Sequence, residues 1–289
     1  MLPSYLLKKI PKQRHIRKLR TILPPELHTV CEEAKCPNIG ECFSQNTCTF
    51  MILGNICTRN CAFCGVSKGK PLPPDPEEPE RIAKAVKKLG LKYVVVTSVT
   101  RDDLPDGGAS QFAAVISKLQ IANYKLQVEV LIPDFQGKEE PLKTALEARP
   151  YVLNHNLETV PRLYPKIRPQ ADYKRSLNIL RQTKIFNPKI YTKSGFMVGL
   201  GESDEEIREV LYDLKEVDCN MVTIGQYLPP SKLHLQPEKF VTPEEFEEYK
   251  KFGEGLGLKV LAGPFVRSSF HARINICVIR KVSTSRCLH

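Results

Sequence analysis

No run of apolar residues in this sequence approaches the roughly 20 residues that a membrane-spanning helix needs. The longest apolar stretches, at residues 93–96 and 190–200, are strand-sized and interrupted by polar residues. Residues 1–20 are basic but lack the apolar block and the cleavage site of a secretory signal. Acidic residues are missing before Glu26, as in mitochondrial transit peptides, but a cysteine motif already begins at Cys31 and leaves little sequence to remove. We therefore expect a mature, cytoplasmic protein with no membrane span.

Internal repeats and low-complexity tracts are also missing. The contents of 42% hydrophobic and 26% charged residues are ordinary for a globular protein, so neither a disordered nor a fibrous class is indicated. A chain of 289 residues suffices for one large domain or two modest ones. The net charge of +11 indicates a basic face, which serves either solubility or an acidic partner such as nucleic acid or a carrier protein. Charge alone leaves that choice open.

Cysteine, by contrast, is abundant. Seven of the ten cysteines fall between Cys31 and Cys64, and the other three are scattered. Disulfide frameworks are usual in small secreted domains, not in a chain of this size without a signal. The clustering therefore points to metal binding.

Strand-like and helix-like segments alternate from residue 48 onward. We expect strands at residues 49–53, 93–99, 126–132, 151–157, 190–198, 221–227 and 259–262. Helices are expected at 80–89, 111–119 and 142–148, and after capping sequences that begin at Ser203 and Thr242. This order predicts an α/β fold, a partial TIM-type (β/α)6 barrel with its active site at the carboxyl ends of the strands. We divide the chain into an N-terminal extension (1–47), a barrel core (48–264) and a C-terminal extension (265–289).

The first chemical motif is a CxxxCxxC sequence formed by Cys57, Cys61 and Cys64, just after a predicted strand. Three thiolates can bind three irons of a 4Fe–4S cluster and leave the fourth iron open to a cofactor or substrate. Structural zinc sites usually pair two CxxC-type knuckles, so this spacing fits zinc poorly. A zinc knuckle is the alternative interpretation.

A second triplet, Cys31, Cys36 and Cys42, is too loosely spaced for an ordinary zinc knuckle. Alone it is a moderate signal for a cluster, and beside the first triplet it becomes a strong one.

Together the two motifs resemble the lipoyl synthase family of radical S-adenosylmethionine (SAM) enzymes. Phe63 occupies the aromatic position before the last cysteine of the first motif, and the second motif distinguishes this family from most other radical SAM enzymes. The resemblance spans nearly the whole chain and implies a barrel of the radical SAM type. Further matching segments lie at residues 97–108, 154–162, 168–171, 193–195, 198–202, 225–228 and 267–272.

The resemblance implies two clusters with different ligands. The cluster that binds SAM would be held by Cys57, Cys61 and Cys64. An auxiliary 4Fe–4S cluster would be held by Cys31, Cys36, Cys42 and Ser269. A serine oxygen binds iron less firmly than a thiolate, which suits a cluster that is dismantled as it gives up sulfur.

The cofactor-binding residues that the resemblance suggests are polar, apart from one aromatic side chain. The hydroxyls of Thr97 and Ser98 would hold the methionyl group of SAM. Asn154, Asn156 and Glu158 would hold its ribose or the substrate. Arg168 and Lys193 would pair with a carboxylate. Each of these side chains also has an ordinary structural explanation, and we interpret the neighbouring His155 as a packing residue. The set is Phe63, Thr97, Ser98, Asn154, Asn156, Glu158, Arg168 and Lys193.

Three positions depart from the family pattern. Phe270 stands where tyrosine is usual, Asn55 stands where an acid is common, and Cys48 is an additional cysteine close to both motifs. None of them is an implied cluster ligand.

The resemblance implies that the substrate is an octanoyl chain. Its carbons are unactivated and carry no acidic proton, so acid–base catalysis cannot remove their hydrogen and a radical is needed. The resemblance implies that an electron from a ferredoxin- or flavodoxin-type donor cleaves SAM. The radical produced removes hydrogen from the sixth and eighth carbons, and the auxiliary cluster provides the two sulfur atoms. The substrate would be octanoyl-lysine on acidic lipoyl-carrier domains, such as those of 2-oxoacid dehydrogenase acyltransferase subunits and the glycine cleavage H protein.

Two other functions are considered. Another sulfur-inserting radical SAM enzyme would act on a small molecule or a tRNA base, but the cysteine spacing and the lack of an obvious appended RNA-binding domain disfavour it. A basic, metal-stabilised nucleic-acid-binding module would contain zinc rather than iron. We expect no nucleic-acid partner.

Overall fold

The computed structural model describes residues 3–8, 13–270 and 272, so most of the predicted C-terminal extension, with Cys277 and Cys287, lies outside the described residues. Its main sheet has the strand order β1–β2–β5–β6–β7–β8–β9–β10. All neighbouring strands run parallel except β1 and β2. The strands are β1 (His28–Thr29), β2 (Thr49–Ile52), β5 (Tyr93–Ser98), β6 (Gln127–Leu131), β7 (Val152–Asn154), β8 (Tyr191–Val198), β9 (Met221–Gln226) and β10 (Lys259–Gly263).

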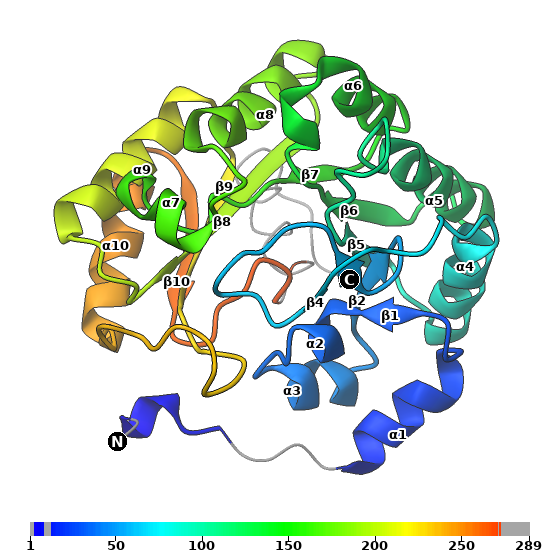
Figure 1. Ribbon diagram of the computed structural model, residues 1–289, viewed down its shortest axis with the longest axis horizontal. Coiled ribbons are helices and arrows are strands. Elements are labelled where there is room, and N and C mark those ends of the chain that lie inside the picture. Colours follow the sequence, from blue (N-terminus) through cyan, green and yellow to red (C-terminus); the bar gives the residue numbers. More distant parts are fainter. Residues whose placement is uncertain (1–2, 9–12, 271, 273–289) are drawn as a thin grey trace, which may run out of the picture.

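Helices surround the curved sheet on its outer side (Figure 1). At least one follows each strand of the main sheet from β2 to β9, which gives six strand–helix units, and β10 is a seventh parallel strand at the edge. The predicted partial barrel is therefore confirmed. The helices of the barrel are α4 (Glu78–Leu89), α5 (Ala109–Ala122), α6 (Glu139–Glu147), α7 (Tyr164–Ile167), α8 (Tyr173–Phe186), α9 (Asp204–Glu216) and α10 (Pro243–Gly255), with short 3₁₀ turns η2 (Phe135–Gly137) and η3 (Pro161–Leu163). Within the described residues, no helix has the length and apolar character that crossing a bilayer requires.

The predicted capping sequences form as expected. Ser203 and Glu206 make a complete capping box at the start of α9, and Thr242 and Glu245 make another at the start of α10. Each box satisfies backbone donors that a helix start leaves free. The strands are nearly continuous buried runs, as a parallel sheet covered on both faces requires.

Helix α8 was not predicted. Its buried face includes Ser176 and Thr183 beside Ile179 and Leu180, so polar residues interrupt the apolar period that marks a helix. Its start is nevertheless capped by Asp172, whose side chain accepts a hydrogen bond from the Arg175 backbone N–H.

The N-terminal residues also form helices, although we predicted none before residue 80. Helices α2 and α3 lie between the β2 and β10 edges of the barrel in the view of Figure 1. The Asn38 side chain ties this region to the C-terminal segment through a 2.7 Å hydrogen bond to the Phe265 carbonyl, and Tyr5 reaches the Phe240 carbonyl at 3.2 Å. The elements here are η1 (Ser4–Leu6), α1 (Gln13–Ile22), α2 (Val30–Glu33) and α3 (Ile39–Ser44).

Candidate active site

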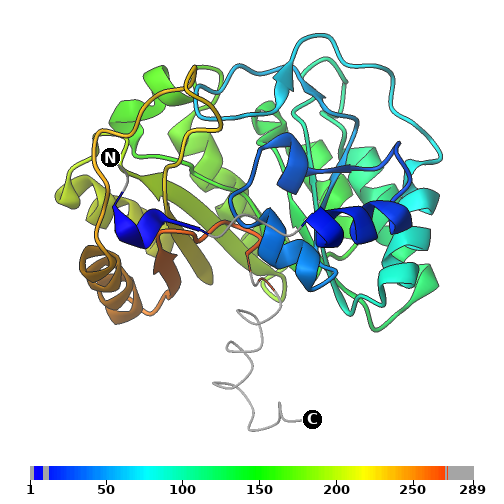
Figure 2. The ribbon, with the colours of Figure 1, turned by 90° about the horizontal axis from the view of Figure 1, so that it is seen from below.

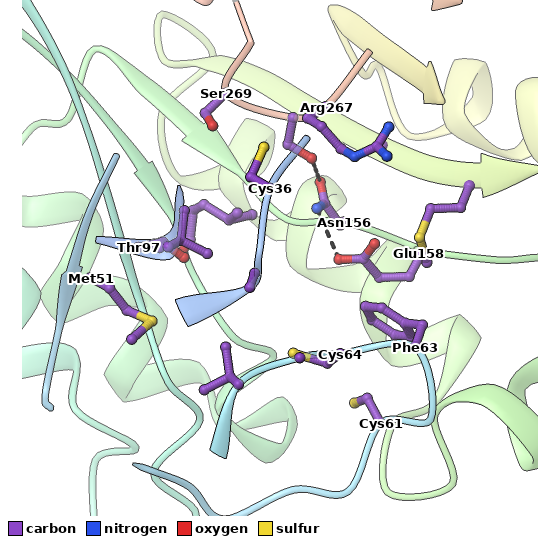
Figure 3. A pocket seen from close by; sticks show the side chains of 18 of the residues that line it. Cys36, Met51, Cys61, Phe63, Cys64, Thr97, Asn156, Glu158, Arg267 and Ser269 are labelled. Carbon is purple, nitrogen blue, oxygen red and sulfur yellow. Dashed lines mark hydrogen bonds between the residues drawn. The ribbon is translucent and has the colours of Figure 1, made fainter. Parts of the chain in front are cut away.

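A cavity of about 340 Å³ lies inside the barrel and is lined by residues of both cysteine motifs. Figure 3 shows Cys36 and Ser269 on one side of it, Cys61, Phe63 and Cys64 on the other, and Asn156 and Glu158 between them. Six of the seven predicted cluster ligands contact this cavity. The seventh, Cys42, lines a second cavity of about 360 Å³ together with Ser269.

The CxxxCxxC loop begins at the end of a two-residue strand, β3 (Ile56–Cys57), which pairs with β4 (Ser67–Lys68) and closes the loop at its base. The Thr58 N–H donates to the Thr100 carbonyl at 3.1 Å, and the Ala62 N–H donates to the Ile167 carbonyl at 2.9 Å. These bonds fasten the loop to the chain beyond β5 and to α7. Figure 2 shows the loop at one end of the barrel, near segment 228–242.

Arg59, inside the motif, holds the loop by charge as well. Its guanidinium donates to both oxygens of Asp102, at 2.6 and 2.9 Å, and to Asp134 at 2.6 Å. Despite their burial, the ion pairs raise the pKa of Arg59 and lower that of Asp134 to about 2. We had not singled out this clamp, although Asp102 lies in a matched segment and Asp134 follows a strand on the active-site edge.

The predicted residues Asn156, Glu158 and Arg168 form one connected group on the cavity wall. The Asn156 amide donates to Glu158 at 2.9 Å and accepts a hydrogen bond from the Ser268 hydroxyl at 2.9 Å. Arg168 donates to the backbone carbonyls of Asn156 and Leu157, both at 3.0 Å, and so holds the loop that carries the other two. Burial raises the pKa of Glu158, although the charge of Arg168 opposes this shift.

Arg267 completes this wall and was not among the predicted site residues. Like Cys36 and Glu158, it lines the cavity. Burial is the main cause that lowers its pKa. The sequence signal that could have identified Arg267 is its place at the start of segment 267–272, which matches the family.

The strand-end hydroxyls of β5 differ from each other. Thr97 donates to the Leu131 carbonyl at 3.0 Å, which is the ordinary structural use of such a group. Ser98 lines the cavity, and its buried hydroxyl has no protein partner among the described residues. Ser98 is therefore the one with bonding capacity to offer a ligand.

Asn154 and Lys193 do not line either cavity. Both side chains are fully buried and contact Glu129, with donor–acceptor distances of 3.0 Å each, and Tyr93 donates a third hydrogen bond to the same carboxylate. We had predicted that both side chains would contact the cofactor. Their observed partner is instead a carboxylate inside the barrel.

Two observations test whether this cavity suits a polar cofactor and iron–sulfur clusters. Buried polar atoms without a protein partner among the described residues include Ser98 Oγ, His155 Nε2, Arg168 Nε and Tyr227 Oη, all on cavity-lining residues, as expected where a polar ligand binds. Burial raises the pKa of both Cys42 and Cys64 to about 11, so iron must displace their protons on binding. The six cysteines of the two triplets are all free thiols, the donors that bind iron–sulfur clusters, so the residues present fit both the polar cofactor and the clusters.

Gly225 on β9 brings the C-terminal segment into this site. A Cβ atom at this position would overlap the Val266 carbonyl oxygen. Only glycine therefore lets residues 265–269 lie directly against the strand and carry Ser269 to the cavity.

His155 predicts a measurable pH effect. Its Nδ1 lies 2.9 Å from the Ile132 carbonyl, and burial and the Arg168 charge lower its pKa to about 4. The unfolded chain binds the proton near pH 6.5, whereas the folded chain does so only near pH 4, so stability falls as the pH drops between these values. We expect about 1.4 kcal/mol of unfolding free energy to be lost by about pH 5.5.

Urea denaturation of the wild type and of His155→Asn, at about pH 7.5 and about pH 5.5, measures this loss. The asparagine keeps a donor for the Ile132 carbonyl but has no imidazole to protonate. An equal pH dependence in the two proteins would contradict the assignment.

Comparison with known proteins decides the family. The profile of the Radical SAM superfamily matches residues 51–214. Lipoyl synthase of Caldanaerobacter subterraneus subsp. tengcongensis is 58% identical over 255 residues, which cover 88% of this chain and 89% of the relative. Lipoyl synthase of Caldicellulosiruptor saccharolyticus is 55% identical over 272 residues, 93% of this chain and 95% of the relative. The chain belongs to the lipoyl synthase family.

Solved structures agree on the fold. The [FeFe]-hydrogenase maturase HydG superposes with a TM-score of 0.60 at 15% identity, covering 78% of this chain and 54% of the maturase. Methylornithine synthase PylB gives 0.55 at 18% identity, covering 73% and 63%. Membership of the lipoyl synthase family confirms the predicted activity, that of a radical SAM sulfurtransferase, and its use of SAM and iron–sulfur clusters.

Proposed function

We propose that the cavity joins two 4Fe–4S centres across one octanoyl chain. Cys57, Cys61 and Cys64 bind the cluster that holds SAM. The auxiliary cluster is bound by Cys31, Cys36, Cys42 and Ser269. The observation that carries this assignment is that residues from both triplets, which lie on separate segments of the chain, contact the same cavity. On this assignment, residues 1–47 and 265–289 provide the auxiliary ligands and residues 48–264 provide the radical SAM core.

When bound, these groups supply a carbon radical and sulfur atoms, and the protein positions and shields the reacting chain. Arg59 fixes the position of the first cysteine loop through Asp102 and Asp134. Ser98, Asn156, Glu158 and the loop held by Arg168 form the polar wall that we assign to SAM, with Phe63 and Thr97 beside it.

The rest of the lining is suited to an acyl chain. Apolar side chains keep water away from the unactivated carbons and hold them near both centres. They include Met51, Val66, Leu131, Met197, Tyr227 and Leu228.

We further propose that the substrate is octanoyl-lysine on acidic lipoyl-carrier domains, which the net charge of +11 would attract. The carriers are the acyltransferase subunits of 2-oxoacid dehydrogenases and the glycine cleavage H protein, and the electron donor is of the ferredoxin or flavodoxin class. The protein works in the cytoplasm.

The test is an anaerobic reaction of the cluster-loaded protein with SAM, a low-potential reductant and an octanoyl-lysine peptide. We expect 5′-deoxyadenosine and a peptide that gains two sulfur atoms by mass, from a protein that contains about eight irons. A reaction with the unacylated peptide is the control and should give no sulfur product. Zinc in place of iron, or a single cluster per chain, would contradict the proposal.

A further inference from the structure

Cys48 is the only one of the seven clustered cysteines that has no role in the proposed function. It is 4% exposed and directly precedes β2. In the antiparallel pairing of β1 and β2, Thr29 lies opposite Phe50. Cys31 lies two residues beyond Thr29, in α2, and Cys48 lies two residues before Phe50, so the pairing brings the two cysteines close together.

Two further observations place the Cys48 thiol among the proposed auxiliary ligands. The Cys31 and Cys48 side chains are both buried and belong to the same hydrophobic cluster. Burial raises the pKa of Cys31, and among the neighbouring thiols Cys48 adds most to that shift, ahead of Cys36 and Cys42. Cys42 likewise contributes to the raised pKa of Cys48, of which burial is the main cause. Cys48 therefore lies close to two ligands of the triplet.

The second cavity connects Cys48 to the fourth proposed ligand. This space of about 360 Å³ is lined by Cys42, Cys48 and Ser269 together. Ser269 also lines the main cavity and so borders both spaces, whereas Cys48 lines only the second.

We propose that Cys48 is a spare fourth ligand of the auxiliary cluster, which binds iron when Ser269 does not. The inference rests on the proposed function of the auxiliary site and extends it. In the exchange, a sulfur–iron bond forms as the oxygen–iron bond breaks, and the proton that leaves the Cys48 thiol goes to the serine oxygen. No electron is transferred. Because thiolate is the better ligand for iron, the exchange would keep iron in the protein while the cluster loses sulfur.

The experiment isolates the auxiliary site in the full-length chain. The background protein carries Cys57→Ala, Cys61→Ala and Cys64→Ala, so that only the auxiliary cluster can assemble. Ser269→Ala, Cys48→Ala and the pair together are added to this background. Iron content and Mössbauer spectra after anaerobic reconstitution are the readouts, and neither depends on activity.

We expect Ser269→Ala to keep about four irons per chain with all iron sites sulfur-coordinated, because Cys48 takes the vacant position. Cys48→Ala alone should keep the cluster with one oxygen-coordinated site. The double variant should fall to about three irons or show a site without thiolate. Cys219→Ala, combined with Ser269→Ala, is the matched control, since Cys219 is equally buried but lines neither cavity.

Three outcomes would overturn the inference. An oxygen-coordinated or missing iron in Ser269→Ala would show that Cys48 does not reach the cluster. Identical spectra for Ser269→Ala and the double variant would do the same. Loss of iron in Cys48→Ala alone would make Cys48 a resident ligand instead of a spare one. A background protein that binds no cluster would instead overturn the proposed auxiliary site itself.

Discussion

Replacing Cys57 with alanine is expected to end 5′-deoxyadenosine formation, whereas replacing Ser269 with alanine is expected to leave it in place and stop sulfur insertion. Cys57 is one of three thiols on the loop that we assign to the SAM-binding cluster, and removing one leaves too few ligands. Ser269 lies across the cavity, on the C-terminal segment. The two substitutions therefore separate radical formation from sulfur transfer.

The loss in Cys57→Ala should be at least about 100-fold, since even residues that only support metal ligands cost 10- to 100-fold when removed. Both products, 5′-deoxyadenosine and the sulfur-containing peptide, are quantified in single-turnover reactions. Cys219→Ala is the control for removal of a buried cysteine, and it should behave like the wild type. Equal loss of 5′-deoxyadenosine in the Cys57 and Ser269 variants would refute the division of roles.

The second large effect concerns stability. The Lys193 ammonium lies 3.0 Å from a Glu129 oxygen, and both side chains are fully buried. Lys193→Met would leave that carboxylate without its cation inside the barrel, with only the Asn154 and Tyr93 hydrogen bonds. We expect a loss of about 3–5 kcal/mol in the free energy of unfolding.

Denaturant unfolding measures this loss, and the double variant Lys193→Met with Glu129→Leu is the informative companion. It removes both charges and should recover much of the stability, because paired apolar replacements of a buried ion pair are often tolerated. If Lys193 instead binds a cofactor carboxylate, as the sequence suggested, Lys193→Met would raise the KM for SAM and leave stability unchanged.

The parts of the fold that local sequence specifies were predicted correctly. Buried strands such as Tyr93–Ser98 are short runs of β-branched residues, and the capping boxes at Ser203 and Thr242 are complete within four residues. Helix α8 was missed because Ser176 and Thr183 face the core, where a periodicity search expects apolar residues. Thr183 can be buried because its hydroxyl donates to the Ile179 carbonyl within the same helix, at 2.8 Å.

For the candidate site too, groups of residues that lie close together in the sequence could be found from it, whereas partners that lie far apart could not. The two cysteine triplets could be identified because each lies within twelve residues, whereas Ser269 came only from resemblance to a family. The partners of Lys193 and Asn154 could not be predicted, because Glu129 lies 25 residues or more away in the sequence. The Arg59 clamp depends on Asp102 and Asp134, which only the closure of the barrel brings to the same loop.

The open side of the barrel has a consequence for how this protein is maintained. The CxxxCxxC loop is fastened to the chain beyond β5 and to α7 by backbone bonds at Thr58 and Ala62, and the buried Arg59 side chain adds two ion pairs. The expendable cluster is instead assigned to two short helical turns and a terminal segment that cover the gap between the outer strands, joined there by contacts such as that of Asn38 with Phe265. Segments of this kind open at lower free energy than core strands. On the proposed assignment, a local opening would let spent iron exchange while the barrel stays folded, and hydrogen exchange at residues 30–44 should be faster than in β5 to β9.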